Sequence, residues 1–234
     1  MPSDERRLKI LVLTDSAANP RSFPASMVVQ LEETYPYLLR DAFERAVFYQ
    51  LSFGNVVTED LASQAVAYLT HWKPDFIVVQ AGLSDCRPEA FTEAEKGVIK
   101  RLPDRFFGRL KKHLYHPPLI KRRQLYRVSP DNFRKTARKL KMVFPRSRLL
   151  WLEICAGADY ELERPGVGRR IVEYNEILHE VFGDDLVRIG EKMHQVNGFN
   201  RDNIHWVKSA HAAVGQILVD RISQALAARD VSAA

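Results

Sequence analysis

Short apolar segments that alternate with helix-like segments are the feature that most limits how this sequence can fold. Runs rich in branched and aromatic apolar residues cover 8–14, 45–51, 74–80, 148–154 and, more weakly, 185–189. Amphipathic patterns with helical spacing cover 60–71, 169–182 and 208–227. Continuous apolar strands separated by helices are typical of a parallel sheet covered on both faces. The sequence therefore predicts an α/β protein, a three-layer α/β/α sandwich around a five-stranded parallel sheet.

The length of 234 residues fits a single domain, which we expect to span residues 1–234. No apolar run approaches the roughly 20 residues of a membrane span, and the first residues lack the apolar core of a secretory signal. The two cysteines, Cys86 and Cys155, cannot make a disulfide framework. We therefore expect a cytoplasmic protein.

Positive charge is concentrated in one stretch of the chain. Residues 100–140 hold 14 basic side chains and two acidic ones, although the whole chain carries a net charge of only +6. Residues 88–128 interrupt the alternation of strands and helices between the third and fourth apolar runs. We predict that they form a partly helical insertion near the strand ends, and we assign the basic stretch to it.

Three interpretations of the basic insertion compete. It could be a surface arm whose charges are solvated, or a lid that contacts an anionic substrate or an anionic lipid surface. It could also bind nucleic acid, which needs such a charge footprint, but no nucleic-acid reading motif accompanies it. Because an insertion after the third strand should lie near the ligand-binding edge of the sheet, we favour a lid that contacts a negatively charged glycan or lipid-linked sugar.

Polar residues follow each of the predicted strands. Parallel sheets bind ligands at the carboxyl ends of their strands, so these residues are the first candidates for a site. Ser16 follows the first strand directly after Asp15, and such a serine can be a nucleophile, although Asp-Ser pairs also commonly cap helices. Gly54 follows the second strand, where it supplies either a turn or an N–H group directed into a site.

The third strand is followed by Gly82-Leu-Ser-Asp-Cys-Arg87, which brings Ser84, Asp85, Cys86 and Arg87 together. Cys86 could be a nucleophile beside Arg87, but a buried structural cysteine is the more frequent case. Near the last helix, Asp202 and His205 are three residues apart, a spacing that suits a base and the carboxylate that orients it. A solvated loop would explain the same pair.

Several other sites are excluded or disfavoured by their motifs. The chain has no Gly-x-Ser-x-Gly elbow and no phosphate-binding Gly-x-x-x-x-Gly-Lys. Gly166 and Gly168 lack the third glycine of a dinucleotide site. His113 and His116 have no acidic or thiol neighbours in sequence, so we expect no metal site and no cofactor.

Taken together, the order of these motifs resembles the SGNH (GDSL-like) hydrolase superfamily. Thr14-Asp-Ser16 is similar to its Gly-Asp-Ser block, Gly82 to Asp85 to its Gly-x-Asn-Asp block, and Asp202 to His205 to its last block. Gly54 matches the glycine of the second block. The resemblance covers most of the chain at low similarity, and residues 33–39 and 82–88 look like a branch found in bacterial glycan biosynthesis.

The resemblance implies a flavodoxin-like fold and a role for each matching residue. Ser16 would attack an acyl carbonyl, His205 would act as base, and Asp202 would orient His205. The oxyanion hole would use Ser16, Gly54 and Ser84, but Ser84 stands where the family usually has asparagine. Loss of one oxyanion donor costs about 3–4 kcal/mol in other enzymes, so this departure bears on the rate. We expect Asp15, Arg21, Asp85 and Arg87 to contact the substrate.

The predicted function is therefore that of a serine esterase. It would remove an acyl group, most simply acetyl, from a carbohydrate or related metabolite through an acyl-enzyme on Ser16. An O-acyltransferase with the same triad, or a non-catalytic glycan-binding protein on the same fold, are the alternatives, and the missing asparagine favours the second of them.

Overall fold

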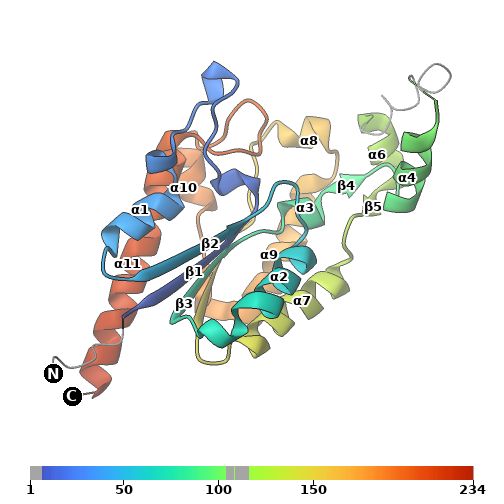
Figure 1. Ribbon diagram of the computed structural model, residues 1–234. Coiled ribbons are helices and arrows are strands. Elements are labelled where there is room, and N and C mark those ends of the chain that lie inside the picture. The colour runs from blue at the N-terminus through green and yellow to red at the C-terminus, as the bar shows by residue number, and fades with distance from the viewer. Residues whose placement is uncertain (1–6, 104–107, 109–115, 234) are drawn as a thin grey trace.

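The computed structural model describes residues 7–103, 108 and 116–233. Its centre is a five-stranded parallel sheet with the strand order β2-β1-β3-β6-β7. Figure 1 labels the first three of these strands, β2, β1 and β3. The strands are β1 (Lys9–Thr14), β2 (Val47–Ser52), β3 (Phe76–Gln80), β6 (Arg148–Leu152) and β7 (Leu186–Val187). The predicted fold class is confirmed.

Helices cover both faces of the sheet. One layer contains α2 (Thr58–Leu69), α7 (Pro130–Val143) and α9 (Val167–Phe182), whose apolar side chains pack on one face. The other contains α1 (Tyr35–Ala42), α10 (Gly190–Gln195) and α11 (Lys208–Ala233). The inner strands β1 and β3 are buried on both faces, which is why their sequences are apolar without alternation.

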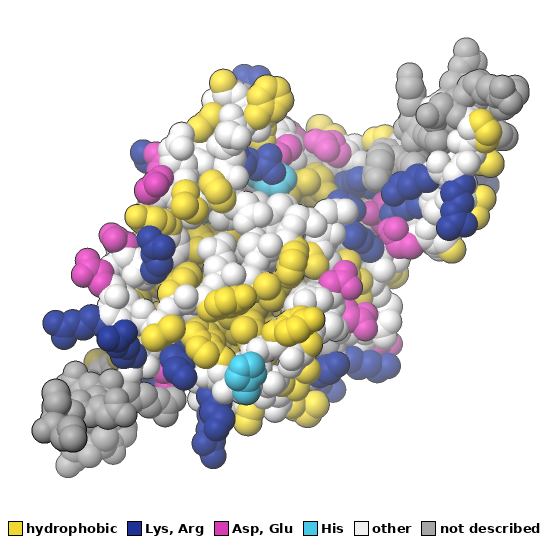
Figure 2. Space-filling model, viewed as in Figure 1, with side chains coloured by type: hydrophobic (Ala, Val, Ile, Leu, Met, Phe, Trp, Pro, Cys, Tyr) yellow, Lys and Arg dark blue, Asp and Glu magenta, His cyan; other side chains and the backbone are white. Residues whose placement is uncertain are grey.

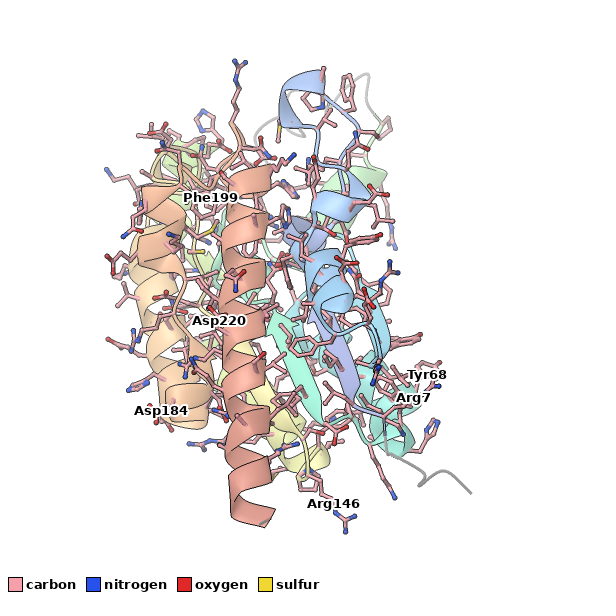
Figure 3. All side chains as sticks on the ribbon, turned by 90° about the vertical axis from the view of Figure 1, so that its left-hand side faces the viewer. Arg7, Tyr68, Arg146, Asp184, Phe199 and Asp220 are labelled. Carbon is pink, nitrogen blue, oxygen red and sulfur yellow. The ribbon has the colours of Figure 1, made fainter. Side chains whose placement is uncertain are left out.

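Figure 3 shows α11 running along one face of the sheet, with Asp220 on its outer side. Phe199 lies near the upper end of this helix, whereas Arg146 and Asp184 lie near the opposite end of the sheet. Asp184 and Arg146 come just before β7 and β6, so the lower end is the amino end of the strands. The carboxyl ends of the strands, where the candidate residues follow, therefore meet at the upper end.

The last predicted strand is shorter than expected. Only Leu186 and Val187 pair with β6, although the apolar run continues to Ile189. The chain leaves the sheet there because the N–H groups of Ile189 and Gly190 donate to the Glu153 carboxylate, at 2.9 and 2.7 Å, where α10 begins.

The described residues between 88 and 128, which we call the arm, project from the upper end of the sandwich (Figure 1). Their described part contains β4 (Pro88–Glu89), α4 (Glu93–Arg101), α6 (Pro117–Arg123) and β5 (Leu125–Tyr126), and β4 pairs with β5 in an antiparallel ladder. Short helices join this ladder to the sandwich, α3 (Leu83–Cys86) before it and α8 (Tyr160–Glu163) after β6.

The assignment of the whole basic stretch to the insertion is wrong. Four of its cations lie on α7, a helix of the sandwich: Arg134, Lys135, Arg138 and Lys139. The amphipathic pattern of α7 places Phe133 and Leu140 in the core and leaves these cations on the outer side, where Arg134 and Arg138 pair with Glu180 of α9. The described cations of the arm are on α4, on α6 and at Arg127, and Figure 2 shows Lys and Arg side chains on its surface. Arg105, Arg109, Lys111, Lys112 and His113 lie outside the described residues.

Among the helices of the described residues, none combines the length and the apolar character needed to cross a membrane.

Candidate active site

Ser16 lies in a short 3-10 turn, Ser16–Ala18, directly after β1. Asp15 caps this turn, because its Oδ1 accepts hydrogen bonds from the N–H of Ala17 at 2.9 Å and from Nε2 of Gln80 at 2.7 Å. The Asp15 N–H also donates to the Gln80 carbonyl oxygen. Burial raises the pKa of Asp15 to about 6, against the lowering effect of these two hydrogen bonds. The end of β3 thus fixes the turn that presents the Ser16 hydroxyl.

The loop that carries Asp202 and His205 is tied to itself. Phe199 and Trp206 form an isolated antiparallel bridge across its base. Asn200 bonds twice across it, its N–H to the His205 carbonyl oxygen at 2.7 Å and its Nδ2 to the Trp206 carbonyl oxygen at 3.0 Å. These bonds satisfy backbone groups that a free loop would leave to water, and they hold the loop in one conformation.

Ser16, His205 and Asp202 form a continuous hydrogen-bonded chain. Oγ of Ser16 lies 3.0 Å from Nε2 of His205, and Nδ1 of His205 lies 2.7 Å from Oδ2 of Asp202. Oδ1 of Asp202 accepts from the N–H groups of Ile204 and His205, at 3.1 and 2.9 Å. A carboxylate on Nδ1 favours the tautomer that leaves Nε2 free to accept the serine proton.

The electrostatics of this chain suit a base. Burial lowers the pKa of His205 and outweighs the raising effect of Asp202, while the positive charge of Arg21 lowers this pKa further. Burial raises the pKa of Asp202, but the hydrogen bonds from His205 and Ile204 prevail and leave it below its usual range. At neutral pH this hydrogen-bonded chain therefore pairs a neutral His205 imidazole with an ionised Asp202 carboxylate. This is the protonation state of a general base and its orienting group.

Gly54 and Ser84 follow β2 and β3, the two strands on either side of β1. The loop after β2 starts beside Ser16, because the Phe53 N–H donates to the Thr14 carbonyl oxygen at 3.2 Å, and Gly54 is exposed in it. Arg127 holds this loop from the base of the arm, with 2.9 Å hydrogen bonds to the side chain and the carbonyl oxygen of Asn55. Ser84 is half-buried in α3, the helix that follows β3.

Gly82 begins α3 with a φ of +123°, a conformation that side chains with a Cβ rarely adopt. A Cβ there would lie 2.4 Å from Cδ1 of Ile154. The glycine of this loop is therefore required by the turn and by the close approach of the neighbouring strand end.

Asp85 is occupied inside the protein. It is fully buried, and its carboxylate accepts from the N–H and the hydroxyl of Thr58, each at 3.0 Å, at the start of α2. Burial raises the pKa of Asp85 to about 7, against the lowering effect of those bonds. The structure thus places Asp85 as a link between α3 and α2.

Arg87 is likewise engaged away from the Ser16 hydroxyl, in a buried ion cluster at the base of the arm. Glu89, only 1% exposed, lies within 4 Å of three cations: Arg87 at 2.9 Å, Lys96 at 3.3 Å and Arg164 at 3.4 Å. Arg164 comes from the segment after α8, so this cluster joins the arm to the sandwich.

Arg21 lies beside the catalytic loop. Its Nη1 is 3.8 Å from Oδ2 of Asp202, and its backbone pairs with Val29 in an antiparallel bridge. Of the four residues expected to contact the substrate, Arg21 is the one that the structure brings against the Asp202–His205 pair.

A small pocket, with room for about one water-sized group, lies between Asp15 and Ala17 of the serine turn and the end of β6. Its lining includes Asp15, Gln80, Leu83, Ile154 and Ile204. These residues follow β1, β3 and β6 or belong to the catalytic loop, so the pocket adjoins the serine turn on the side of the sheet.

Sequence reasoning missed several residues that hold the site. Gln80 and Asn200 fix the two catalytic loops, and Arg127 fixes the loop of Gly54. A polar residue at the end of an otherwise apolar strand was a usable signal for Gln80. Asn200 binds the carbonyl oxygens of His205 and Trp206, and Arg127 binds Asn55 in a distant loop. Neither set of contacts corresponds to a recognisable spacing of residues in the sequence.

Comparison with solved structures identifies the fold. A lipase/acylhydrolase from Enterococcus faecalis is 15% identical, with 92% of this chain and 95% of that chain covered and a TM-score of 0.63. An acetyl xylan esterase is 14% identical, with coverages of 92% and 100% and a TM-score of 0.62. A GDSL-like lipase from Bacteroides thetaiotaomicron is 8% identical, with coverages of 93% and 88% and a TM-score of 0.56.

No protein-family model and no curated protein matches the sequence. The likeness to these solved structures confirms the resemblance at the level of the fold: the chain has the fold of the SGNH hydrolases.

Proposed function

We propose that the protein is a serine ester hydrolase with Ser16 as nucleophile, His205 as general base and Asp202 as the group that orients His205. The observation that carries this proposal is the hydrogen-bonded chain from Oγ of Ser16 through the imidazole to the Asp202 carboxylate. The fold neighbours support it, since their names describe lipases, acylhydrolases and esterases.

The reaction has two steps. Ser16 Oγ attacks the ester carbonyl carbon while Nε2 of His205 takes the hydroxyl proton, and His205 then gives that proton to the leaving alkoxide as the ester C–O bond breaks. Water attacks the acyl-enzyme, again with His205 as base. Breakage of the acyl–Ser16 bond then releases the carboxylic acid and restores the serine hydroxyl.

The oxyanion formed in each step needs hydrogen-bond donors. We propose the N–H groups of Ser16 and Gly54 and the hydroxyl of Ser84 for this role. A hydroxyl donates a single hydrogen bond and is shorter than a carboxamide, so the Ser84→Asn variant tests whether the serine limits the rate. An increase in kcat of about tenfold or more would mark Ser84 as a weak donor.

The proposed substrate is a short acyl ester, most simply an acetyl ester, of a carbohydrate or related metabolite. The acetyl xylan esterase among the fold neighbours supports a carbohydrate ester by analogy alone. We further propose, from the sequence features above, that the protein acts in the cytoplasm, which cell fractionation would test.

Two measurements test the enzyme assignment. A fluorophosphonate probe should label the wild-type protein and the Ser63→Ala variant, which changes an exposed serine on α2, but not Ser16→Ala. 4-Nitrophenyl acetate should be hydrolysed by the same two proteins, while Ser16→Ala and His205→Ala lower kcat by about 10³-fold or more. No labelling and no turnover across acyl lengths would overturn the proposal in favour of a non-catalytic glycan-binding protein.

Acyl transfer uses the same acyl-enzyme and differs only in the acceptor. Adding sugar alcohols to the acetate-release assay separates the two reactions. A rise in acetylated sugar at the expense of acetate would identify an O-acyltransferase.

A further inference from the structure

Arg21 is held firmly at the edge of the catalytic loop. Its N–H donates to the Val29 carbonyl oxygen at 2.8 Å and its carbonyl oxygen accepts from the Val29 N–H at 2.9 Å. This bridge closes the loop between the two residues, and the guanidinium of Arg21 reaches the Asp202 carboxylate with 24% of the side chain still exposed. The backbone of Arg21 is therefore held in place, and its side chain remains partly open to solvent.

The Asp202 carboxylate does not require Arg21 for its position. Three N–H donors already bind it at 3.1 Å or less, two from the backbone of Ile204 and His205 and one from the imidazole. The contact from Arg21 Nη1, at 3.8 Å, is longer than a hydrogen bond. The guanidinium thus acts on Asp202 through charge alone.

The guanidinium of Arg21 has an N–H donor that no described residue binds. Nε of Arg21 is buried and has no hydrogen-bond partner among the described residues. A buried N–H of a charged group without an acceptor is costly, and such groups are normally paired. An acceptor that arrives with the substrate would satisfy it.

The position of this charge also opposes the proposed chemistry. His205 must become an imidazolium when it takes the proton of Ser16, and a neighbouring cation makes that state less favourable. A ligand that brings a negative charge to Arg21 would cancel this effect at the moment of reaction.

Resting on the proposed function, we propose that Arg21 binds an anionic group, a carboxylate or a phosphate, on the alcohol part of the ester. His205 protonates the leaving oxygen, so the alcohol part must lie against His205, and Arg21 reaches the Asp202 oxygen that binds the same imidazole. The planar guanidinium binds either oxyanion with two parallel hydrogen bonds. The substrate class is thus an O-acetylated acidic sugar or sugar phosphate.

The test compares three esters with the same acetyl group: an acetylated methyl glucoside, the matching acetylated glucuronoside and an acetylated sugar phosphate. Wild type should hydrolyse at least one anionic ester about ten- to one-hundred-fold better, in kcat/KM, than the neutral one. Arg21→Gln should lower kcat/KM on the anionic ester far more than on the neutral one and so abolish that preference, while Arg21→Lys keeps part of it. The two anionic esters distinguish carboxylate from phosphate recognition.

The pH profile gives a second readout that a purely structural role would not move. On the neutral ester, Arg21→Gln should shift the basic-form limb of kcat/KM to higher pH, because loss of the cation raises the pKa of His205. Arg146→Gln, an exposed arginine at the opposite end of the sheet in Figure 3, is the control and should change neither measurement.

Equal losses on neutral and anionic esters in Arg21→Gln and Arg21→Lys would overturn the inference, as would a wild type that does not prefer an anionic ester. If Ser16→Ala retained turnover of all three esters, the proposal that Ser16 is the nucleophile would fail. That result is distinct from the two results that would overturn the role of Arg21 alone.

Discussion

The edge of the sheet at Ser16 and the base of the arm hold their carboxylates in opposite ways. Asp15 is bound by a backbone N–H and a neutral amide, and Asp202 by two backbone N–H groups and an imidazole. Glu89 of the arm is instead surrounded by three cations. Directional bonds to neutral groups hold the first two, with Arg21 adding a cation 3.8 Å from Asp202, and ion pairs hold the third.

The difference separates two tasks. At the catalytic edge His205 must gain and lose a proton, and permanent charges packed around it would oppose one of its two states. At the base of the arm no side chain needs to change its charge. An ion cluster can therefore join the arm to the segment after α8, although the two share no strand of the main sheet. We therefore expect substitutions at the edge to lower activity with little loss of stability. Substitutions at the base of the arm should lower stability with little loss of activity.

The largest effect should come from Asp202→Asn. The amide keeps an oxygen for the two backbone N–H groups, so the loop stays folded, but it no longer favours the productive imidazole tautomer. We expect kcat to fall about 10³- to 10⁴-fold, with the free energy of unfolding changed by less than about 1 kcal/mol.

Steady-state kinetics and urea denaturation on the same preparation check this pair of values. Asp184→Asn, an exposed aspartate at the opposite end of the sheet (Figure 3), should leave both unchanged. If Asp202→Asn lost stability in proportion to activity, the catalytic edge would not be the independent region described here.

Glu89→Gln should produce the reverse pattern. It removes the negative charge shared by Arg87, Lys96 and Arg164 and leaves these cations together in a buried position. Breaking a buried ion pair from one side typically costs about 3–5 kcal/mol, so we expect a loss of that size in unfolding free energy. Hydrolysis of 4-nitrophenyl acetate by the folded fraction should change less than about threefold.

Glu93 offers a matched control, because it also pairs with Lys96 but its side chain is 66% exposed. Glu93→Gln should cost less than about 1 kcal/mol, as exposed pairs do. Equal losses from the two variants would show that burial of the cluster is not what matters.

His211 makes the catalytic side sensitive to acid. It is buried behind the catalytic loop against Trp206 and Tyr35, and its Nδ1 accepts from the Tyr35 N–H at 3.3 Å. Burial lowers the pKa of His211 to about 4, against a raising effect of Glu33. In the unfolded chain this histidine titrates near 6.5, so the unfolded state binds the proton first as the pH falls.

The contribution of His211 to stability is fully present above pH 6.5 and is lost as the pH falls towards 4. Between pH 7 and pH 5 the stability difference between wild type and His211→Gln should shift by about 2 kcal/mol against the wild type. Urea denaturation at the two pH values measures it. A pH-independent difference would mean that His211 is not held in its neutral form.

The sheet and the positions of the candidate site residues could be predicted because local sequence carries both. Ile10 to Leu13 and Phe76 to Val79 are apolar on both faces, and the topology then brings whatever follows them to one edge. Ser16 and the Asp202–His205 pair follow from that rule and a three-residue spacing.

The remaining features depend on contacts between distant segments. The cations of α7 are as numerous as its apolar residues, so its sequence does not stand out as a core helix, although Phe133 and Leu140 pack in the core. Asp85 and Arg87 look like site residues in a loop, yet Thr58 of α2 binds Asp85, and Glu89, two residues further along the chain, binds Arg87. Sequence spacing says which residues are near a strand end but not which way each one faces.

The smallest effect on a small ester should come from the surface of the arm, and this is where its proposed role can be tested. Lys121 and Arg122 are exposed on α6 and form no ion pair with the described residues, whereas Arg123 pairs with Glu95 at 2.9 Å. We propose that the first two contact an anionic glycan or an anionic lipid surface. The Lys121→Glu, Arg122→Glu variant should leave stability and 4-nitrophenyl acetate hydrolysis within about twofold of wild type, because exposed charges contribute little to folding.

The same double variant should weaken binding to acidic oligosaccharides or to vesicles containing anionic lipid, and the loss should be greatest at low salt, where charges are least screened. Arg123→Glu is the informative contrast, since it breaks the pair with Glu95 and should lower stability instead. If the double variant binds both anionic partners as wild type does, the cations of the arm are solvated surface charges. The arm would then differ from the catalytic edge in having no ligand at all.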